Sequence, residues 1–144
     1  MRKFLYVLLL AAVGASAVSC CSACRGAKVV PVSGTQWALI ELNDQVIDRE
    51  GNNAERLTLT LGEDGRVAGV GDCNRFFGPY SYYADGRIDI SNLGSTRMLC
   101  PNQALEDQYF RALQNATSFK IDGDFLLLTD AHSKLIASFK RIDK

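Results

Sequence analysis

From Thr35 onward, short apolar runs alternate with polar turns. Hydrophobic side chains recur at every second position in segments 35–42, 57–61 and 134–142, as expected for strands with one buried face. The predicted buried faces hold Trp37, Leu39 and Glu41 in the first segment, Leu57, Leu59 and Leu61 in the second, and Leu135, Ala137 and Phe139 in the third. The polar stretch 43–55 predicts a loop.

Three further turns are marked by Asp-Gly dipeptides at 64–65, 85–86 and 122–123. Asp-Gly tolerates positive φ and therefore favours tight hairpins. Strands joined by hairpins pair antiparallel. Turn spacing and apolar runs together predict about seven to eight strands.

One segment follows a helical period instead. Apolar side chains recur at helical spacing from Pro101 to Asn115, and proline suits the first turn of a helix. The stripe consists of Leu105, Tyr109, Ala112, Leu113 and Ala116. We expect a mainly β (α+β) fold, a small curved antiparallel sheet or partly open barrel, with the single helix on one face or in the mouth.

The first 19 residues have the pattern of an export signal. Arg2 and Lys3 precede an apolar run from Phe4 to Val18, which is shorter than the ~20 residues needed to span a bilayer. Ala17-Val18-Ser19-Cys20 is similar to a bacterial lipobox, so we predict a signal peptide at 1–19 and a lipid anchor on Cys20. An ordinary secretory signal cleaved near Ala17 is the alternative.

The rest of the chain divides into a tether at 20–34 and a domain at 35–144. Basic and acidic residues both number 16, and 14 basic residues remain once the signal peptide is removed. This mildly acidic balance, without a basic stripe, argues against nucleic-acid binding. The single histidine, His132, excludes a multi-histidine metal centre within one chain, and we expect neither metal nor cofactor.

The five cysteines form two groups. Cys21 and Cys24 have the Cys-x-x-Cys spacing of redox and zinc sites, but they lie in the tether, so we expect them to pair with each other or stay free. Cys73 and Cys100 stand apart. A disulfide between them would close a loop of about 28 residues and contribute about 3–4 kcal/mol. Two buried free thiols are the alternative.

The segment GVGDCNRFFGPY, Gly69 to Tyr80, holds the candidate site residues. Catalysis by Cys73 would need a base, and His132 lies in a predicted surface turn. Aromatic side chains of this stretch either fill the core or form a docking patch. We take Asn74, Arg75 and Phe77 as the candidate binding residues.

The order of these residues resembles the META domain family, which includes the heat-shock lipoprotein HslJ. The positions that match are Trp37-x-Leu39, Leu57-x-Leu59, Gly65-x-Val67-x-Gly69, Asp72-Cys73-Asn74-Arg75-Phe76-x-Gly78-x-Tyr80, Ser95-Thr96-Arg97-Met98-Leu99-Cys100, Glu106, Leu113 and Leu126-x-Leu128. Asp72 replaces a glycine and Leu99 a common alanine. The resemblance implies a small β-rich fold with one helix, a cell-envelope location, and Cys73 and Cys100 as paired positions. It implies no known reaction and no catalytic residue.

We therefore expect a non-enzymatic lipoprotein of the cell envelope, facing the periplasm. It is held to the membrane through its lipid anchor and binds an envelope protein partner or takes part in the envelope stress response. One alternative is a carrier that holds an apolar ligand in a small barrel. Another is a thiol-dependent enzyme that uses Cys73.

Overall fold

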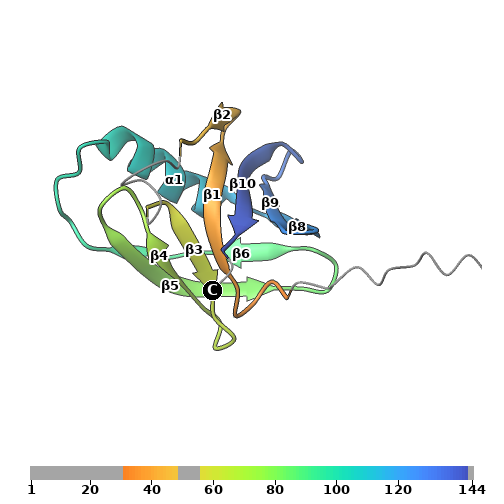
Figure 1. Cartoon of the computed structure of the whole chain (residues 1–144). Helices are drawn as coiled ribbons and strands as arrows, with labels where there is room; N and C mark the ends of the chain where they lie inside the picture. The colour runs from red at the N-terminus through yellow and green to blue at the C-terminus, as the bar shows by residue number, and fades with distance from the viewer. Residues whose placement is uncertain (1–30, 49–55, 143–144) are drawn as a thin grey trace, which may run out of the picture.

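The computed structural model describes residues 31–48 and 56–142, so the signal peptide, Cys20, Cys21 and Cys24 lie outside the described residues. Within them, ten strands and one helix follow one another along the chain (Figure 1). The elements are β1 (Gln36–Leu42), β2 (Gln45–Val46), β3 (Thr58–Leu61), β4 (Arg66–Val70), β5 (Arg75–Tyr82), β6 (Ile88–Ile90), β7 (Gly94–Ser95), α1 (Gln103–Asn115), β8 (Ser118–Asp122), β9 (Phe125–Thr129) and β10 (Leu135–Arg141).

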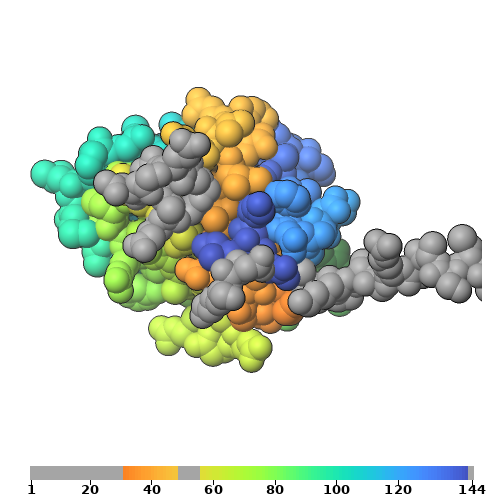
Figure 2. Space-filling view, viewed as in Figure 1, coloured from red at the N-terminus to blue at the C-terminus, as the bar shows by residue number. Residues whose placement is uncertain are grey.

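Eight strands form one antiparallel path in the order β6-β5-β4-β3-β1-β10-β9-β8. In the space-filling view, β1 (orange) lies between β10 and β9 (blue) and the yellow-green strands β3 to β5 (Figure 2). The two ends of the path also meet, because the Ile88 amide donates to the Thr117 carbonyl at 3.0 Å and the Phe119 amide to the Gly86 carbonyl at 2.7 Å. The sheet is a nearly closed barrel, which confirms the predicted fold class.

The three Asp-Gly turns are confirmed. Gly65, Gly86 and Gly123 have φ values of 76°, 88° and 59°, in the left-handed region that glycine adopts without strain. They join β3 to β4, β5 to β6 and β8 to β9. Each turn therefore joins two strands that are consecutive in the sequence and adjacent in the barrel.

The predicted buried face of the first strand is wrong at Glu41. The pairing of β1 with β10 shifts register between Leu39 and Glu41, which marks a β-bulge. The bulge turns Glu41 away from the interior and places Leu42 there, 1% exposed. The predicted loop 43–55 also contains the short strand β2, which pairs with β1.

Helix α1 begins at Gln103, two residues later than the predicted start at Pro101, because Asn102 is its N-cap. The Asn102 side chain accepts a hydrogen bond from the Leu105 amide at 3.3 Å and so caps the helix. Pro101 therefore lies just before the cap. The end at Asn115 is as predicted.

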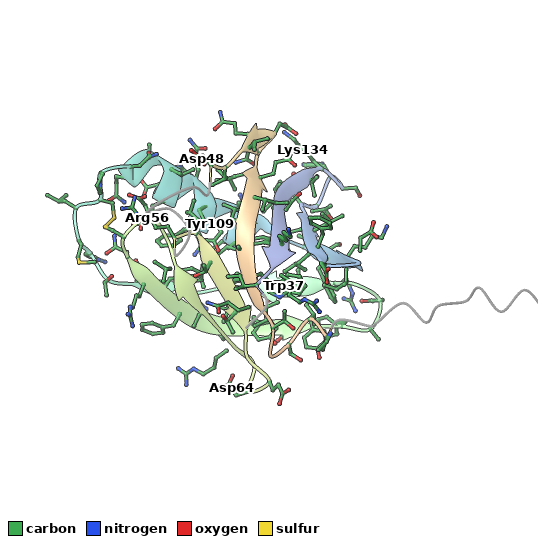
Figure 3. The ribbon with its side chains drawn as sticks, in the orientation of Figure 1. Trp37, Asp48, Arg56, Asp64, Tyr109 and Lys134 are labelled. Atoms are coloured by element: carbon green, nitrogen blue, oxygen red, sulfur yellow. A yellow bond between two sulfur atoms is a disulfide. The ribbon has the colours of Figure 1, made fainter. Side chains whose placement is uncertain are left out.

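The helix packs its apolar stripe against the barrel interior. Tyr109 is fully buried and its hydroxyl donates to the Thr58 carbonyl at 3.0 Å, while its ring meets Phe76 edge-on. Trp37 and Tyr109 both point inward (Figure 3). Side chains thus fill the barrel interior, and the helix fixes the strands around it. Within residues 31–48 and 56–142, no helix is both long and apolar enough to cross a membrane.

Candidate functional site

The segment Gly69–Tyr80 comprises the end of β4, a turn and most of β5. The turn is closed by a 2.7 Å hydrogen bond from the Gly71 amide to the Asn74 carbonyl. From Arg75 onward the chain is extended and alternates inward and outward side chains. The candidate residues therefore occupy two different environments, a buried turn and an exposed strand face.

Asn74 is the centre of the turn and is 2% exposed. Its side-chain oxygen accepts hydrogen bonds from the Thr96 hydroxyl at 2.8 Å and the Met98 amide at 2.7 Å. Its side-chain nitrogen donates to the Met98 carbonyl at 3.0 Å and to Glu106 Oε1 at 2.7 Å. One side chain thus binds both backbone groups of Met98 and a helix carboxylate. Because these groups are all engaged within the protein, the Asn74 side chain has a structural role and does not face a partner.

Glu106 lies on α1 beneath this turn and is 1% exposed. Besides the Asn74 side chain, its carboxylate accepts the backbone amides of Cys73 at 3.2 Å and Asn74 at 3.0 Å. Burial alone raises the pKa of Glu106, but the hydrogen bonds from Asn74 and Cys73 outweigh it and hold the pKa below its ordinary value. The carboxylate is therefore ionised and serves as the acceptor around which the turn folds.

Close packing around Glu106 also explains a glycine. A Cβ atom on Gly71 would lie 2.5 Å from Glu106 Oε2, which is closer than van der Waals contact permits. Only glycine lets the turn approach the carboxylate this closely. The backbone of the turn is thus shaped to fit the buried acid.

The second link between the turn and the loop after β7 is covalent. Cys73 and Cys100 form a disulfide with their Cα atoms 5.5 Å apart. This confirms the disulfide and excludes the alternative of two free thiols. We call Asn74, Glu106, Thr96, Met98 and this disulfide the Asn74 cluster. The two sulfur atoms and a Glu106 oxygen lie within 4.8 Å of one another, but bonded sulfurs are not the thiolates that bind metals or attack substrates.

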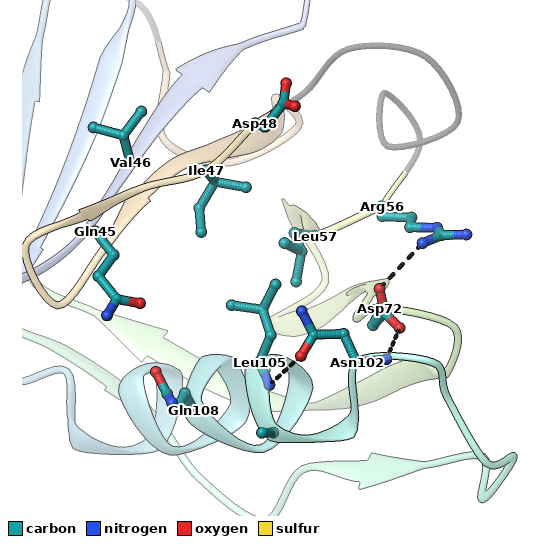
Figure 4. A pocket seen from close by; sticks show the side chains of 11 residues that line it. Gln45, Val46, Ile47, Asp48, Arg56, Leu57, Asp72, Asn102, Leu105 and Gln108 are labelled. Carbon is teal, nitrogen blue, oxygen red and sulfur yellow. Dashed lines mark hydrogen bonds and ion pairs between the residues drawn. The ribbon is translucent and has the colours of Figure 1, made fainter.

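Asp72 connects the same turn to the start of the helix. It is 5% exposed, accepts the Asn102 amide at 3.0 Å and forms an ion pair with Arg56 at 3.3 Å (Figure 4). A carboxylate at a helix N-terminus is stabilised by the helix dipole. The replacement of the family's glycine by Asp72 therefore adds a further link between the turn and α1.

A groove lies beside this ion pair, between β2 and α1 (Figure 4). Its volume is about 420 Å³. Apolar side chains of Ile47, Leu57 and Leu105 line its centre. Leu57 has a φ of 52°, which is unusual for a bulky residue and turns the chain from Arg56 into β3. This groove is outside the packed barrel interior.

The remaining candidates separate into core and surface. Phe76 and Tyr80 are buried, which confirms the core interpretation for them, whereas Arg75 is exposed and Phe77 is 57% exposed. His132 lies in the exposed turn after β9, where its backbone amide donates to Asp130. The structure therefore brings Cys73, Asn74 and Cys100 together and leaves Arg75 and Phe77 facing outward.

Sequence reasoning missed the roles of Glu106 and Arg56. The family resemblance includes Glu106 among its matching positions but implies no role for it. The signal that it is buried is its place three residues before Tyr109 and seven before Leu113, on the apolar face of the helix. An acid on such a face must find partners. Arg56 gives no comparable signal in the sequence.

Comparison with known proteins places this arrangement in a family. The sequence profile of the META domain matches residues 30–143. No protein with a curated description matches. A protein from Burkholderia xenovorans solved by NMR has a similar fold, with a TM-score of 0.60, 23% identity, and coverage of 78% of this chain and 85% of that one. A DUF4847 family protein from Bacteroides vulgatus has a TM-score of 0.56 and 13% identity, over 78% of this chain and 96% of that one. The profile covers most of the sequence, and the chain therefore belongs to the META domain family.

Proposed function

We propose that this protein is a lipid-anchored, non-enzymatic binding module of the bacterial cell envelope. Cys20 is its acylated residue, and the META domain is the module that faces the periplasm. The signal pattern and lipobox of residues 1–20 support this location. The Cys73–Cys100 disulfide also supports it, since disulfides persist in oxidising compartments.

The proposal of a non-enzymatic role rests on the Asn74 cluster, in which the reactive groups are bonded to other parts of the protein. Cys73 is bonded to Cys100, and the Glu106 carboxylate already accepts hydrogen bonds from the backbone amides of the turn. A cysteine nucleophile needs a free thiolate, and a general base needs access to its substrate. These groups instead hold two segments and a helix in place.

The binding part of the proposal is supported by the side chains that the cluster displays. Leu99 is 99% exposed and Met98 is 55% exposed, although both are apolar. Asn74 binds the backbone of Met98, and the disulfide fixes Cys100, so Leu99 is held between two fixed points. Apolar side chains displayed on a rigid frame lose little entropy on binding.

Intact-mass analysis of protein extracted from membranes tests the anchor. We expect the chain to begin at Cys20 and to include the mass of attached acyl groups. Cys20→Ser should abolish this mass, whereas Cys21→Ser, the matched control one residue away, should retain it. A mature chain without acyl mass, or acylation that persists in Cys20→Ser, contradicts the proposal.

A role as carrier is the second candidate, but the ligand would not lie inside the barrel as expected from the sequence, because side chains fill that interior. The groove between β2 and α1 offers an apolar site of about 420 Å³ instead. This volume lies within the range of small-ligand sites, roughly 300–1,000 Å³. Saturable binding of a fluorescent fatty acid that is lost in Leu105→Arg and retained in Leu99→Arg would favour the carrier. Absence of binding would exclude it for this ligand class.

A further inference from the structure

The outward face of β4 and β5 combines apolar and cationic side chains. On β5, Arg75, Phe77 and Pro79 are exposed while the residues between them are buried. Ala68 of β4 lies opposite Phe77 in the antiparallel register and is also exposed. Phe77 therefore stands in the middle of a small apolar area with Arg75 at one end.

The loop after β7 lies beside this face and beside the start of α1. The Thr96 amide donates to the Arg75 carbonyl at 3.0 Å, which places the loop beside the start of β5. The next three residues, Arg97, Met98 and Leu99, are all exposed. We define the outer face as Ala68, Arg75, Phe77, Pro79, Arg97, Met98 and Leu99.

Charge is distributed unevenly along this surface. Arg75 and Arg97 lie at the end that displays Met98 and Leu99. At the other end, Arg66 lies opposite Pro79. Asp64 is close to Arg66, because its side chain accepts the Arg66 backbone amide at 3.1 Å. On α1, the acidic residues Glu106 and Asp107 both line the hollow that contains Met98 and Leu99, but Glu106 is buried and only Asp107 is exposed. Two arginines thus flank the exposed apolar side chains, in a mature chain that is mildly acidic as a whole.

We propose that the outer face lies on an anionic lipid surface, with Phe77, Met98 and Leu99 at the boundary of headgroups and acyl chains. Arg75 and Arg97 contact lipid phosphates. Apolar side chains beside basic ones are the combination that binds such surfaces. An arginine side chain near an anionic leaflet is attracted to its negative surface potential. Charge complementarity therefore favours an anionic surface over a neutral one.

This inference rests on the proposed lipid anchor in one respect, which is proximity. The ten residues 21–30 can span at most about 33–36 Å between Cys20 and the domain. An anchored domain is consequently held near the bilayer, where weak contacts suffice. The outer face then sets which side of the domain meets the lipid.

Met98 provides a native probe of this contact. The chain has two methionines, and Met1 lies in the predicted signal peptide. Peroxide converts an exposed methionine to its sulfoxide, and burial slows the reaction. Full-length protein extracted with its anchor is reconstituted into vesicles of phosphatidylcholine alone or with phosphatidylglycerol, and Met98 oxidation is followed by peptide mass.

We expect Met98 to oxidise at least about threefold more slowly in vesicles with phosphatidylglycerol than in phosphatidylcholine alone. Combined Arg75→Gln and Arg97→Gln should remove this difference. Arg111→Gln, an exposed arginine on α1, should leave it unchanged. Equal oxidation rates in the two kinds of vesicle, or protection that the double variant retains, would overturn the proposal and leave the face available to a protein partner.

The same samples separate failure of the anchor from failure of the face. Flotation with pure phosphatidylcholine vesicles reports the anchor, and Met98 protection reports the face. Protein that does not float with phosphatidylcholine but gains Met98 protection from phosphatidylglycerol vesicles supports the face and contradicts the anchor. Protein that floats with both but shows equal oxidation supports the anchor and contradicts the face.

Discussion

The side-chain amide of Asn74 donates a 2.7 Å hydrogen bond to Glu106, 32 residues further along the chain and on the single helix of the described domain. Both residues are almost fully buried. The backbone amides of Cys73 and Asn74 donate to the same carboxylate. The most unusual segment of the sequence therefore folds around a buried negative charge.

The two donors of the Asn74 side chain are the groups most directly tested by substitution. Asn74→Asp keeps the shape but removes the donors to Met98 and Glu106 and places a second carboxylate beside Glu106. We expect a loss of about 2–4 kcal/mol in the free energy of unfolding, measured in urea. The exposed Asn115→Ala should change it by less than about 0.5 kcal/mol. A loss in Asn74→Asp no larger than in this control would contradict the assigned role.

The lowered pKa of Glu106 predicts a pH dependence. A group whose pKa is lower in the folded state stabilises the fold above its ordinary pKa of 4.5, and this contribution is lost as pH falls through the folded value. Glu106→Gln should cost about 2–3 kcal/mol at pH 7. The difference in unfolding free energy between wild type and variant should narrow as the pH falls below about 4.5.

Comparing the two proteins isolates Glu106 from other acids. Asp85, through its hydrogen bond with the Arg87 side chain, and Asp130, through the Lys134 amide, also have lowered pKa values, but both variants share them. Urea unfolding at several pH values makes the measurement. A difference in unfolding free energy that does not narrow at any pH below 4.5 is inconsistent with an ionised, hydrogen-bonded Glu106.

The disulfide predicts a non-additive pair of substitutions. Cys73→Ser and Cys100→Ser each break the same bond, so each should lower the free energy of unfolding by about 3–4 kcal/mol. The double variant should lose no more than either single one. Thermal unfolding of the three variants checks this. Additive losses would indicate that each cysteine has a separate role.

Much of this fold follows from local sequence signals. Asp-Gly dipeptides at 85–86 and 122–123 mark hairpins because left-handed turns need such residues wherever they occur. The apolar stripe around Tyr109 and Leu113 likewise marks the helix. These predictions are local, and the tertiary structure agrees with them.

The parts that could not be predicted depend on contacts between distant segments. The bulge that turns Glu41 outward arises from the pairing of β1 with β10, almost a hundred residues later in the chain. The sequence predicts that the helix starts at Pro101, whereas the side chain of Asn102 caps it and it begins at Gln103. The partners of Glu106 come from a turn more than thirty residues earlier, a relationship that no local pattern encodes.

Substitution of an exposed apolar side chain of the outer face should leave the free energy of unfolding nearly unchanged. Leu99 is 99% exposed, so Leu99→Ser should change the free energy of unfolding by less than about 0.5 kcal/mol. Leu113 is fully buried, and Leu113→Ala should cost about 2–5 kcal/mol. Urea unfolding of both variants provides the comparison. A large loss in Leu99→Ser would mean that Leu99 stabilises the fold and is not displayed for binding.

The coupling free energy between Asn74 and Glu106 measures whether these two residues act together as a structural unit. It is obtained from urea unfolding of wild type, Asn74→Ala, Glu106→Ala and the double variant, with the disulfide intact. We predict that the double variant loses less than the sum of the single losses by about 1.5–3 kcal/mol. Losses that add without coupling would contradict the account.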